Sequence, residues 1–176
     1  KIALGENEQL DFKFRIDDQK KIARTLSAFS NTSGGSLLIG VKDNGKVAGV
    51  DPEEEIHMIE GAAALYCKPA IQIESNVWQE GHHLVLEIVV SKSDIRHKSL
   101  ADDGSWRNFY RIEDNTIQGN KILDRVWSYR SSGIDRPESF SDEELGVLNV
   151  IREEEPVSIS KIYRRSELKM AKIDKF

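Results

Sequence analysis

The chain has 176 residues, enough for one domain with a small appendage, and its 39% hydrophobic and 31% charged residues exclude a fully disordered protein. Its formal charge of −5 argues against indiscriminate binding to nucleic acid or anionic lipid, but is compatible with a local basic face. No apolar run reaches the length of a membrane span, and the single cysteine excludes a disulfide scaffold. We therefore expect a cytoplasmic protein with no membrane partner.

The first fifty residues carry the patterns of a strand, a helix and a hairpin. Apolar and polar residues alternate over residues 9–14, which is the period of a strand. An apolar stripe at helical spacing then runs from Ile22 to Ser30, after an aspartate cap at 17 or 18, and stops at a pair of glycines. A buried strand over 36–41 leads into an Asn-Gly turn, which tolerates positive φ, and a short return strand.

The middle of the chain predicts a second helix followed by more strands. Asp51-Pro52 and three glutamates form a typical helix start, with acids at the positive end of the helix dipole. The remaining elements that we expect are a long hairpin over 71–90, a polar loop over 91–105, a strand over 106–112 and a helix that opens at 116–119 and carries Ile122 to Trp127.

The last part of the chain reads as a linker and a helical extension. Serines, one glycine and one proline occupy 130–139. Ser141 and Glu144 form a capping box that opens one helix, and a second helix is expected over 158–170 after Pro156. Two short helices in this position resemble the opening of a helix-turn-helix or winged-helix unit.

One motif suggests a phosphate loop and is better explained as a hairpin. Residues 40–46 fit the spacing G-x-x-x-x-G-K, but Val47 stands where a phosphate loop needs Ser or Thr. The context is also strand, turn and strand rather than strand, loop and helix. We therefore predict no ATP binding.

Acidic residues near the start of the chain form a candidate metal site. Asp11 and Lys13 share one face of a strand, and a carboxylate-x-lysine pair on a strand is a recurrent nuclease arrangement. With Glu6 and Asp43, the carboxylates could hold magnesium or manganese. The alternative is a solvated strand face on which Asp and Lys form cross-strand pairs, and the spacing alone favours this alternative.

Basic residues beside aromatic ones form a candidate nucleic-acid site. Arg96 and Lys98 precede a strand in which Arg107 and Arg111 alternate with aromatic residues. Such cations can hold phosphates while bases stack on the rings. A half-buried strand with aromatic side chains inward explains the same pattern equally well.

No pair of the four histidines has zinc-type spacing, so we expect no structural zinc.

Together these segments resemble the Schlafen AlbA-type domain, a family also described as a divergent AAA group. The resemblance covers about residues 4–130 and rests on four motifs: Glu6-x-x-x-x-Asp11-Phe12-Lys13, then Ala28-Phe29-Ser30-Asn31-Thr32-Ser33-Gly34-Gly35, then Leu38 to Gly45 with Val47-x-Gly49, and finally Phe109-Tyr110-Arg111-Ile112 with Asn115-Thr116. The chain departs from the family pattern at Asp11, where glutamate is usual, and at Ser30, where alanine is usual.

The resemblance implies an α+β fold, with a mixed β-sheet flanked by helices and, here, a short helical C-terminal extension. Bacterial members are described as DNA-binding or transcriptional-regulator domains, often followed by a winged helix. Vertebrate relatives include RNA-cleaving enzymes whose metal-binding acids match Glu6, Asp11 and, less closely, Asp43. Those enzymes build a groove from two such lobes, whereas this chain holds one, and a homodimer could supply the second.

We accordingly expect a nucleic-acid-binding domain over 1–130, a linker over 131–140 and a helical extension over 141–176. The main hypothesis is a module of a bacterial DNA-binding transcriptional regulator that needs no cofactor, with DNA favoured over RNA as the partner. The alternative is a ribonuclease that uses magnesium or manganese. The residues expected to contact nucleic acid are Lys13, Arg15, Lys42, Arg96, Lys98, Arg107 and Arg111.

Overall fold

The computed structural model describes residues 1–120, 124–125, 128, 140–153 and 158–165. The chain forms two compact units, Lys1–Gly133 and Ile134–Phe176, and each is described by itself. The linker predicted over 131–140 lies outside the described residues except for Phe140. Within the described parts of the chain, no helix combines the length and apolar character that crossing a membrane requires.

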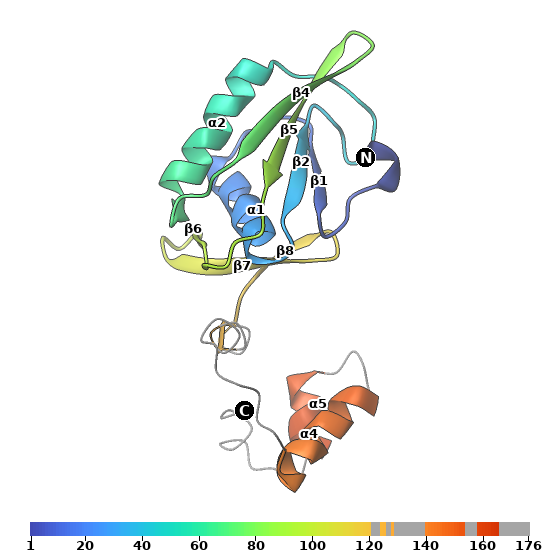
Figure 1. The fold of residues 1–176 in the computed structure, drawn as a ribbon, viewed down its shortest axis with the longest axis vertical. Helices are drawn as coiled ribbons and strands as arrows, with labels where there is room; N and C mark the ends of the chain where they lie inside the picture. The colour runs from blue at the N-terminus through green and yellow to red at the C-terminus, as the bar shows by residue number, and fades with distance from the viewer. Residues whose placement is uncertain (121–123, 126–127, 129–139, 154–157, 166–176) are drawn as a thin grey trace. The chain divides into compact units, whose positions relative to one another are not determined.

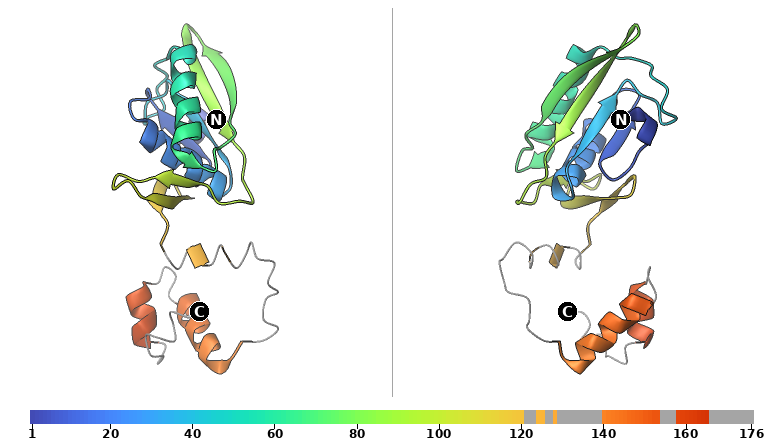
Figure 2. Two further views of the ribbon diagram at one scale, coloured as in Figure 1. Left: turned by 90° about the vertical axis from the view of Figure 1, so that its left-hand side faces the viewer. Right: turned by 45° about the vertical axis from the view of Figure 1, so that its right-hand side comes forward.

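The first unit is built from two four-stranded sheets and two long helices (Figures 1 and 2). The first sheet has the order β1-β2-β5-β4 and is mixed, because β1 and β2 run parallel while the other pairs are antiparallel. The second sheet has the order β3-β6-β7-β8 and is antiparallel. The predicted α+β class with a mixed sheet and flanking helices is therefore confirmed. The elements of this unit are the short 3-10 helix η1 (Ile2–Leu4), β1 (Leu10–Lys13), α1 (Gln19–Asn31), β2 (Gly35–Ile39), α2 (Pro52–Leu65), β3 (Cys67–Lys68), β4 (Glu74–Glu80), β5 (His83–Val90), β6 (Lys98–Leu100), β7 (Trp106–Ile112) and β8 (Asn115–Gln118).

The main core lies between the first sheet and the helices α1 and α2. Phe29 and Leu26 of α1 are fully buried against Leu37 of β2, and Ile59 of α2 joins the same cluster. A smaller apolar cluster covers the opposite face of the sheet, where Phe12 packs with neighbours from β2 and β5. Strand β1 therefore has both faces buried, which places its polar side chains inside the protein as well.

Capping residues define where both helices begin, as the sequence predicts. The carboxylate of Asp18 accepts hydrogen bonds from the backbone N–H groups of Lys20 and Lys21, at 2.9 and 3.2 Å. Asp51 does the same for the backbone N–H of Glu53, at 3.0 Å. Each cap satisfies backbone donors that the first helical turn leaves free.

The Asn-Gly turn is also confirmed, while its return strand is reduced to one bridge. Gly45 adopts a φ of 78°, and the N–H of Lys42 donates to the carbonyl of Lys46 at 3.0 Å. Only Val41 and Val47 then form a bridge. Residues 40–46 thus form a turn between paired residues, as the hairpin interpretation of the G-x-x-x-x-G-K motif requires.

Three strands of the second sheet differ from the sequence prediction. Strands β3 and β6 have only two and three residues, too few to show a period of two. Strand β8 occupies the segment predicted to open a helix, because a tight turn at Glu113, with φ 55°, folds it back onto β7. The apolar residues predicted to continue that helix lie outside the described residues.

The buried thiol of Cys67 belongs to the main core. Its Sγ lies 3.4 Å from the carbonyl of Ala23, and burial raises the pKa of the thiol to about 12. Its neighbour Lys68 is exposed, because successive side chains of a strand point to opposite faces.

The second unit contains α4 (Asp142–Glu153) and α5 (Ile159–Arg165). The predicted capping box is present: the backbone N–H of Glu144 donates to the Oγ of Ser141 at 3.3 Å, and the Glu144 carboxylate accepts from the backbone N–H of Ser141 at 2.7 Å. The two helices contact each other.

The side chain of Asn31 joins the end of α1 to the second sheet. It is fully buried, and its Nδ2 donates to the carbonyls of His97 and Phe109 at 2.8 and 3.0 Å. Its Oδ1 accepts from the backbone N–H of His97 at 2.9 Å. One amide therefore satisfies backbone groups beside β6 and in β7, which explains why asparagine is suited to this position of the Asn-Thr-x-Gly-Gly motif.

We expect Asn31→Asp to destabilise the fold by about 3 kcal/mol at neutral pH, because a carboxylate oxygen would face two carbonyl oxygens. The deficit should shrink at acidic pH, since protonation removes the buried charge. Urea unfolding at several pH values measures this. The matched control is Asn44→Asp in the exposed turn, where Oδ1 only accepts a hydrogen bond, from the backbone N–H of Lys46. Equal effects of the two changes would contradict the role assigned to Asn31.

Candidate nucleic-acid interface

The three predicted metal-binding acids do not come together as a ligand set. Asp11 is buried, and its two oxygens accept from the Nζ of Lys13 at 2.6 Å and from Nη1 of Arg111 at 3.1 Å. The Oε1 of Glu6 accepts from the backbone N–H of Phe12 at 2.8 Å, and Asp43 is exposed in the turn. Among the described residues, no group of three His, Cys, Asp or Glu side chains could hold a metal ion. The residues as arranged do not fit a divalent cation.

Arg111 lies inside the protein rather than on a binding surface. Only 3% of it is exposed, and its guanidinium donates to Asp11, to the Oγ1 of Thr116 at 3.2 Å and to the carbonyl of Asn7 at 2.9 Å. The guanidinium also lies over the ring of Phe29, 5.1 Å from its centroid. The expectation that Arg111 contacts phosphate does not fit this burial. Arg111 instead connects β7 with β1 and β8.

The remaining six predicted cations fall into two groups on different sheets. The first group lies at the end of β1 and at the start of the 42–46 turn. It consists of Lys13, Arg15 and Lys42. Lys42 lies over the ring of Phe14, 5.5 Å from the centroid, and Phe14 is 49% exposed. An exposed aromatic ring beside exposed cations is an arrangement that suits a nucleotide.

The second group belongs to β6, β7 and the loop before β6. Lys98 is exposed, whereas Arg96 is half-buried and its guanidinium donates to the carbonyl of Asn31 at 2.8 Å. Arg107 is exposed and pairs with Asp103 at 2.8 Å. Hydrogen bonds from Ser105, together with Arg107, hold the pKa of the Asp103 carboxyl well below its usual range, so this acid offsets part of the positive charge at neutral pH.

The register of the second sheet places Lys98 in a row with two other polar residues. Lys98 lies directly opposite Lys68 on one side and opposite Asn108 on the other. Directly paired residues share a face of the sheet, with Cβ atoms about 5 Å apart. Trp106, two residues before Asn108, shares that face, and the Nζ of Lys68 lies over its ring, 4.1 Å from the centroid.

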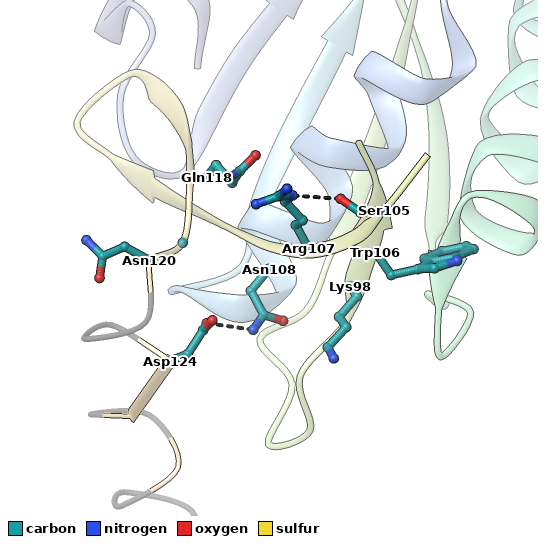
Figure 3. Close-up of a pocket in the computed structure, with 9 residues that line it drawn as sticks. Lys98, Ser105, Trp106, Arg107, Asn108, Gln118, Asn120 and Asp124 are labelled. Carbon is teal, nitrogen blue, oxygen red and sulfur yellow. Dashed lines mark hydrogen bonds between the residues drawn. The ribbon is translucent and has the colours of Figure 1, made fainter. Parts of the chain in front are cut away.

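A polar pocket of about 470 Å³ opens where β7 begins and β8 ends (Figure 3). Lys98 and Asn108 point to one side of β7, while Arg107 and Gln118 lie on the other. Asn108 donates to the carboxylate of Asp124 at 2.6 Å. The pocket is lined by Lys98, Ser105, Trp106, Arg107, Asn108, Gln118, Gly119, Asn120 and Asp124.

Gly119, which lines this pocket, packs closely against the buried Tyr110. A Cβ on Gly119 would lie 2.7 Å from the Tyr110 ring, so only glycine lets the chain pass this closely. The Tyr110 hydroxyl is 3.3 Å from Asp124. Burial and the nearby Asp124 carboxylate raise the pKa of Tyr110 to about 12, so the phenol stays neutral and can act as a hydrogen-bond donor.

Sequence reasoning identified Lys98 and Arg107 but missed Lys68, Gln118 and Asn120 as neighbours of the same site. Lys68 belongs to a strand of two residues, which leaves no pattern in the sequence. Gln118 ends strand β8, in a segment that was predicted to open a helix. The signal that could have found Gln118 and Asn120 is the tight turn at 113–114, because it folds β8 back onto β7.

A comparison with models of known protein families matches the part of the chain that forms the two sheets. The model of the family described as Schlafen, AlbA_2 matches residues 6–120, which is more than half of the sequence. The chain therefore belongs to the Schlafen AlbA_2 family, and this membership supports a nucleic-acid-related function. None of the curated proteins compared with the chain is similar to it.

The solved structures that are similar to this chain include the following two. The DIP2311 protein from Corynebacterium diphtheriae has a TM-score of 0.54 and 14% identity, over 93% of this chain and 37% of its own length. It shares the fold, and the present chain corresponds to well under half of that protein. The N-terminal domain of a protein related to the ATP-dependent DNA helicase RecG, from Nitrosomonas europaea, has a TM-score of 0.45 and 26% identity, over 62% of this chain and 80% of the other.

We expect Asp11→Asn to lower the free energy of unfolding by about 3 kcal/mol, because it leaves the buried Arg111 charge without its counter-ion. Denaturant unfolding followed by circular dichroism measures the loss. The control is Asp43→Asn, which removes an exposed carboxylate and should change stability by less than about 0.5 kcal/mol. A similar small change for Asp11→Asn would show that the buried pair contributes little.

Proposed function

We propose that the first unit is a nucleic-acid-binding module of a bacterial DNA-binding transcriptional regulator, with DNA preferred to RNA. The phosphate contacts would come from the cations that are not fully buried. These are Lys13, Arg15, Lys42, Arg96, Lys98 and Arg107. Arg111 is left out because its guanidinium is engaged with Asp11 inside the protein.

The observation that carries the proposal is the placement of Lys98 and Arg107 in the same polar pocket beside Trp106. Nucleic acid offers a negative backbone and flat aromatic bases, so a binding site combines cations with an aromatic surface. Phe14 with Lys42 repeats this combination on the other sheet. The net charge of −5 then limits non-specific attraction, so binding depends on these local groups.

Three further features of the regulator hypothesis are part of the proposal. Helices α4 and α5 would be the first helices of a winged-helix unit, which would begin at the capping box of α4. Homodimerisation would let two such modules contact one DNA site, and the setting would be the cytoplasm. Sedimentation of the chain with and without DNA tests the dimer directly.

The ribonuclease alternative would need Asp11 as a metal ligand, and Lys13 and Arg111 already occupy its oxygens. Incubating the purified chain with a structured RNA and Mn²⁺ tests it. We expect no cleavage above that of a matched Glu6→Gln preparation. Cleavage that depends on Mn²⁺ and is lost in Glu6→Gln would favour the enzyme over the binding module.

We expect the affinity for a fluorescein-labelled duplex DNA to fall with salt, with a slope of about −3 to −5 on a log–log plot, because roughly 4–6 phosphates would be neutralised. Lys98→Gln should reduce the magnitude of this slope by about 1. Fluorescence anisotropy between low and moderate salt measures both values, and the same titration with RNA tests the preference for DNA.

The control for this titration is Lys92→Gln, an exposed lysine after β5 that has no part in the proposed contacts. It should leave the salt slope unchanged. Absence of binding to DNA and RNA at low salt, or binding that ignores salt, would remove the proposed function.

A further inference from the structure

We infer that the pocket at the start of β7 receives one unstacked nucleotide of a single-stranded or locally opened DNA, with its phosphate on Lys68 and Lys98 and its base against Trp106. The inference rests on the proposed function and adds the kind of nucleic acid that the module takes. Four properties of this part of the second sheet support it: a lysine pair of which Lys98 lines the pocket, a tryptophan beside that pair, mixed polar groups and the shape of the pocket.

The first property is the direct pairing of Lys68 with Lys98 across β3 and β6. Like charges directly opposite each other on one face of a sheet repel. Both lysines are exposed, and within the described part of the chain no carboxylate forms an ion pair with either ammonium group. An anion placed between them would relieve the repulsion. A single phosphate group has the charge and size for that position.

The second property is the position of Trp106 beside these lysines. Trp106 is half-buried and is one of the residues that line the pocket, and the Lys68 ammonium lies over its ring. A base that packs against the indole would therefore carry its phosphate close to the lysine pair. Base–aromatic stacking is sequence-tolerant, because every base has a π-face.

The third property is the balance of charge and hydrogen-bonding groups. The lining contains two cations, Lys98 and Arg107, but also the carboxylate of Asp124 and three amide side chains. The pocket is therefore more than an anion site, and its mixture of donors and acceptors matches the edge of a nucleobase.

The fourth property is the shape of the site. Its volume is about 470 Å³, which is in the range of small-molecule sites, and the pocket is widely open to solvent. A base inside an intact duplex has both faces covered by its neighbours, so it cannot pack a face against Trp106. The nucleotide has to leave the stack, which costs least where the DNA is already single-stranded.

The test compares three labelled DNA probes by fluorescence anisotropy: a single strand of about 12 nucleotides, the perfect duplex of that sequence, and the duplex with a one-nucleotide bulge. We expect the single strand and the bulged duplex to bind about tenfold more tightly than the perfect duplex. Trp106→Ala should weaken binding to these two probes by about tenfold and change the affinity for the perfect duplex by less than about twofold.

Two sets of variants make the result specific. Trp106→Phe keeps an aromatic face and should retain most of the affinity for the single strand, which also separates stacking from any folding defect of the alanine variant. Trp78→Ala removes an exposed tryptophan of β4, in the other sheet, and should have no effect on any probe. Lys68→Gln combined with Lys98→Gln should weaken binding to all three probes.

Equal affinities for the three probes, with no effect of Trp106→Ala, would overturn the inference and leave the proposed function standing. Failure of every probe to bind at low salt would overturn both. A loss of affinity in Trp106→Ala that is equal for all probes and not rescued by Trp106→Phe would also overturn the inference, because it would indicate a structural role for the ring.

Discussion

The ion pair between Asp11 and Arg111 is the interaction on which the rest of the first unit depends. It joins residues that are 100 positions apart and links β1 of the first sheet to β7 of the second. Both partners are almost fully buried, so the Arg111 charge depends on Asp11, whose other oxygen accepts from Lys13. Two residues at the end of α1 complete the junction. Asn31 binds backbone groups at the second sheet, and the Oγ1 of Thr32 accepts from the backbone N–H of Arg111 at 3.0 Å. These contacts set the position of β7, and β7 supplies the site.

This junction gives a physical reason for the motifs shared with the family. The acidic residue of the first motif, the Asn-Thr of the second and the arginine of the last meet at one place. By residue type, Asp11 was a candidate metal ligand and Arg111 a candidate phosphate contact, since carboxylates bind metal ions and guanidinium groups bind phosphates. In this chain the two groups neutralise each other inside the protein. A motif that is chemically suggestive can therefore be structural, and burial decides between the two.

Most of the fold could be predicted from local patterns, and most of the site could not. The caps at Asp18 and Asp51, the Asn-Gly turn and the long hairpin are local features, so the sequence contains the whole signal. The row of Lys68, Lys98 and Asn108 depends on three strands whose register is fixed by long-range pairing, and two of those strands are shorter than any detectable period. The face of β1 that carries Asp11 looked solvated for the same reason: nothing local reveals that a second sheet covers it.

The reactivity of Cys67 can report how often strand β3 detaches from the second sheet. The cysteine stands next to Lys68 on β3, with its sulfur in the core and its thiol proton tightly held at neutral pH. A thiol reagent can modify it only after β3 detaches and exposes it, so the rate of alkylation measures an opening equilibrium of that strand. Because the chain has no second cysteine, the signal comes from this strand alone, and any ligand that bridges β3 to β6 would slow it.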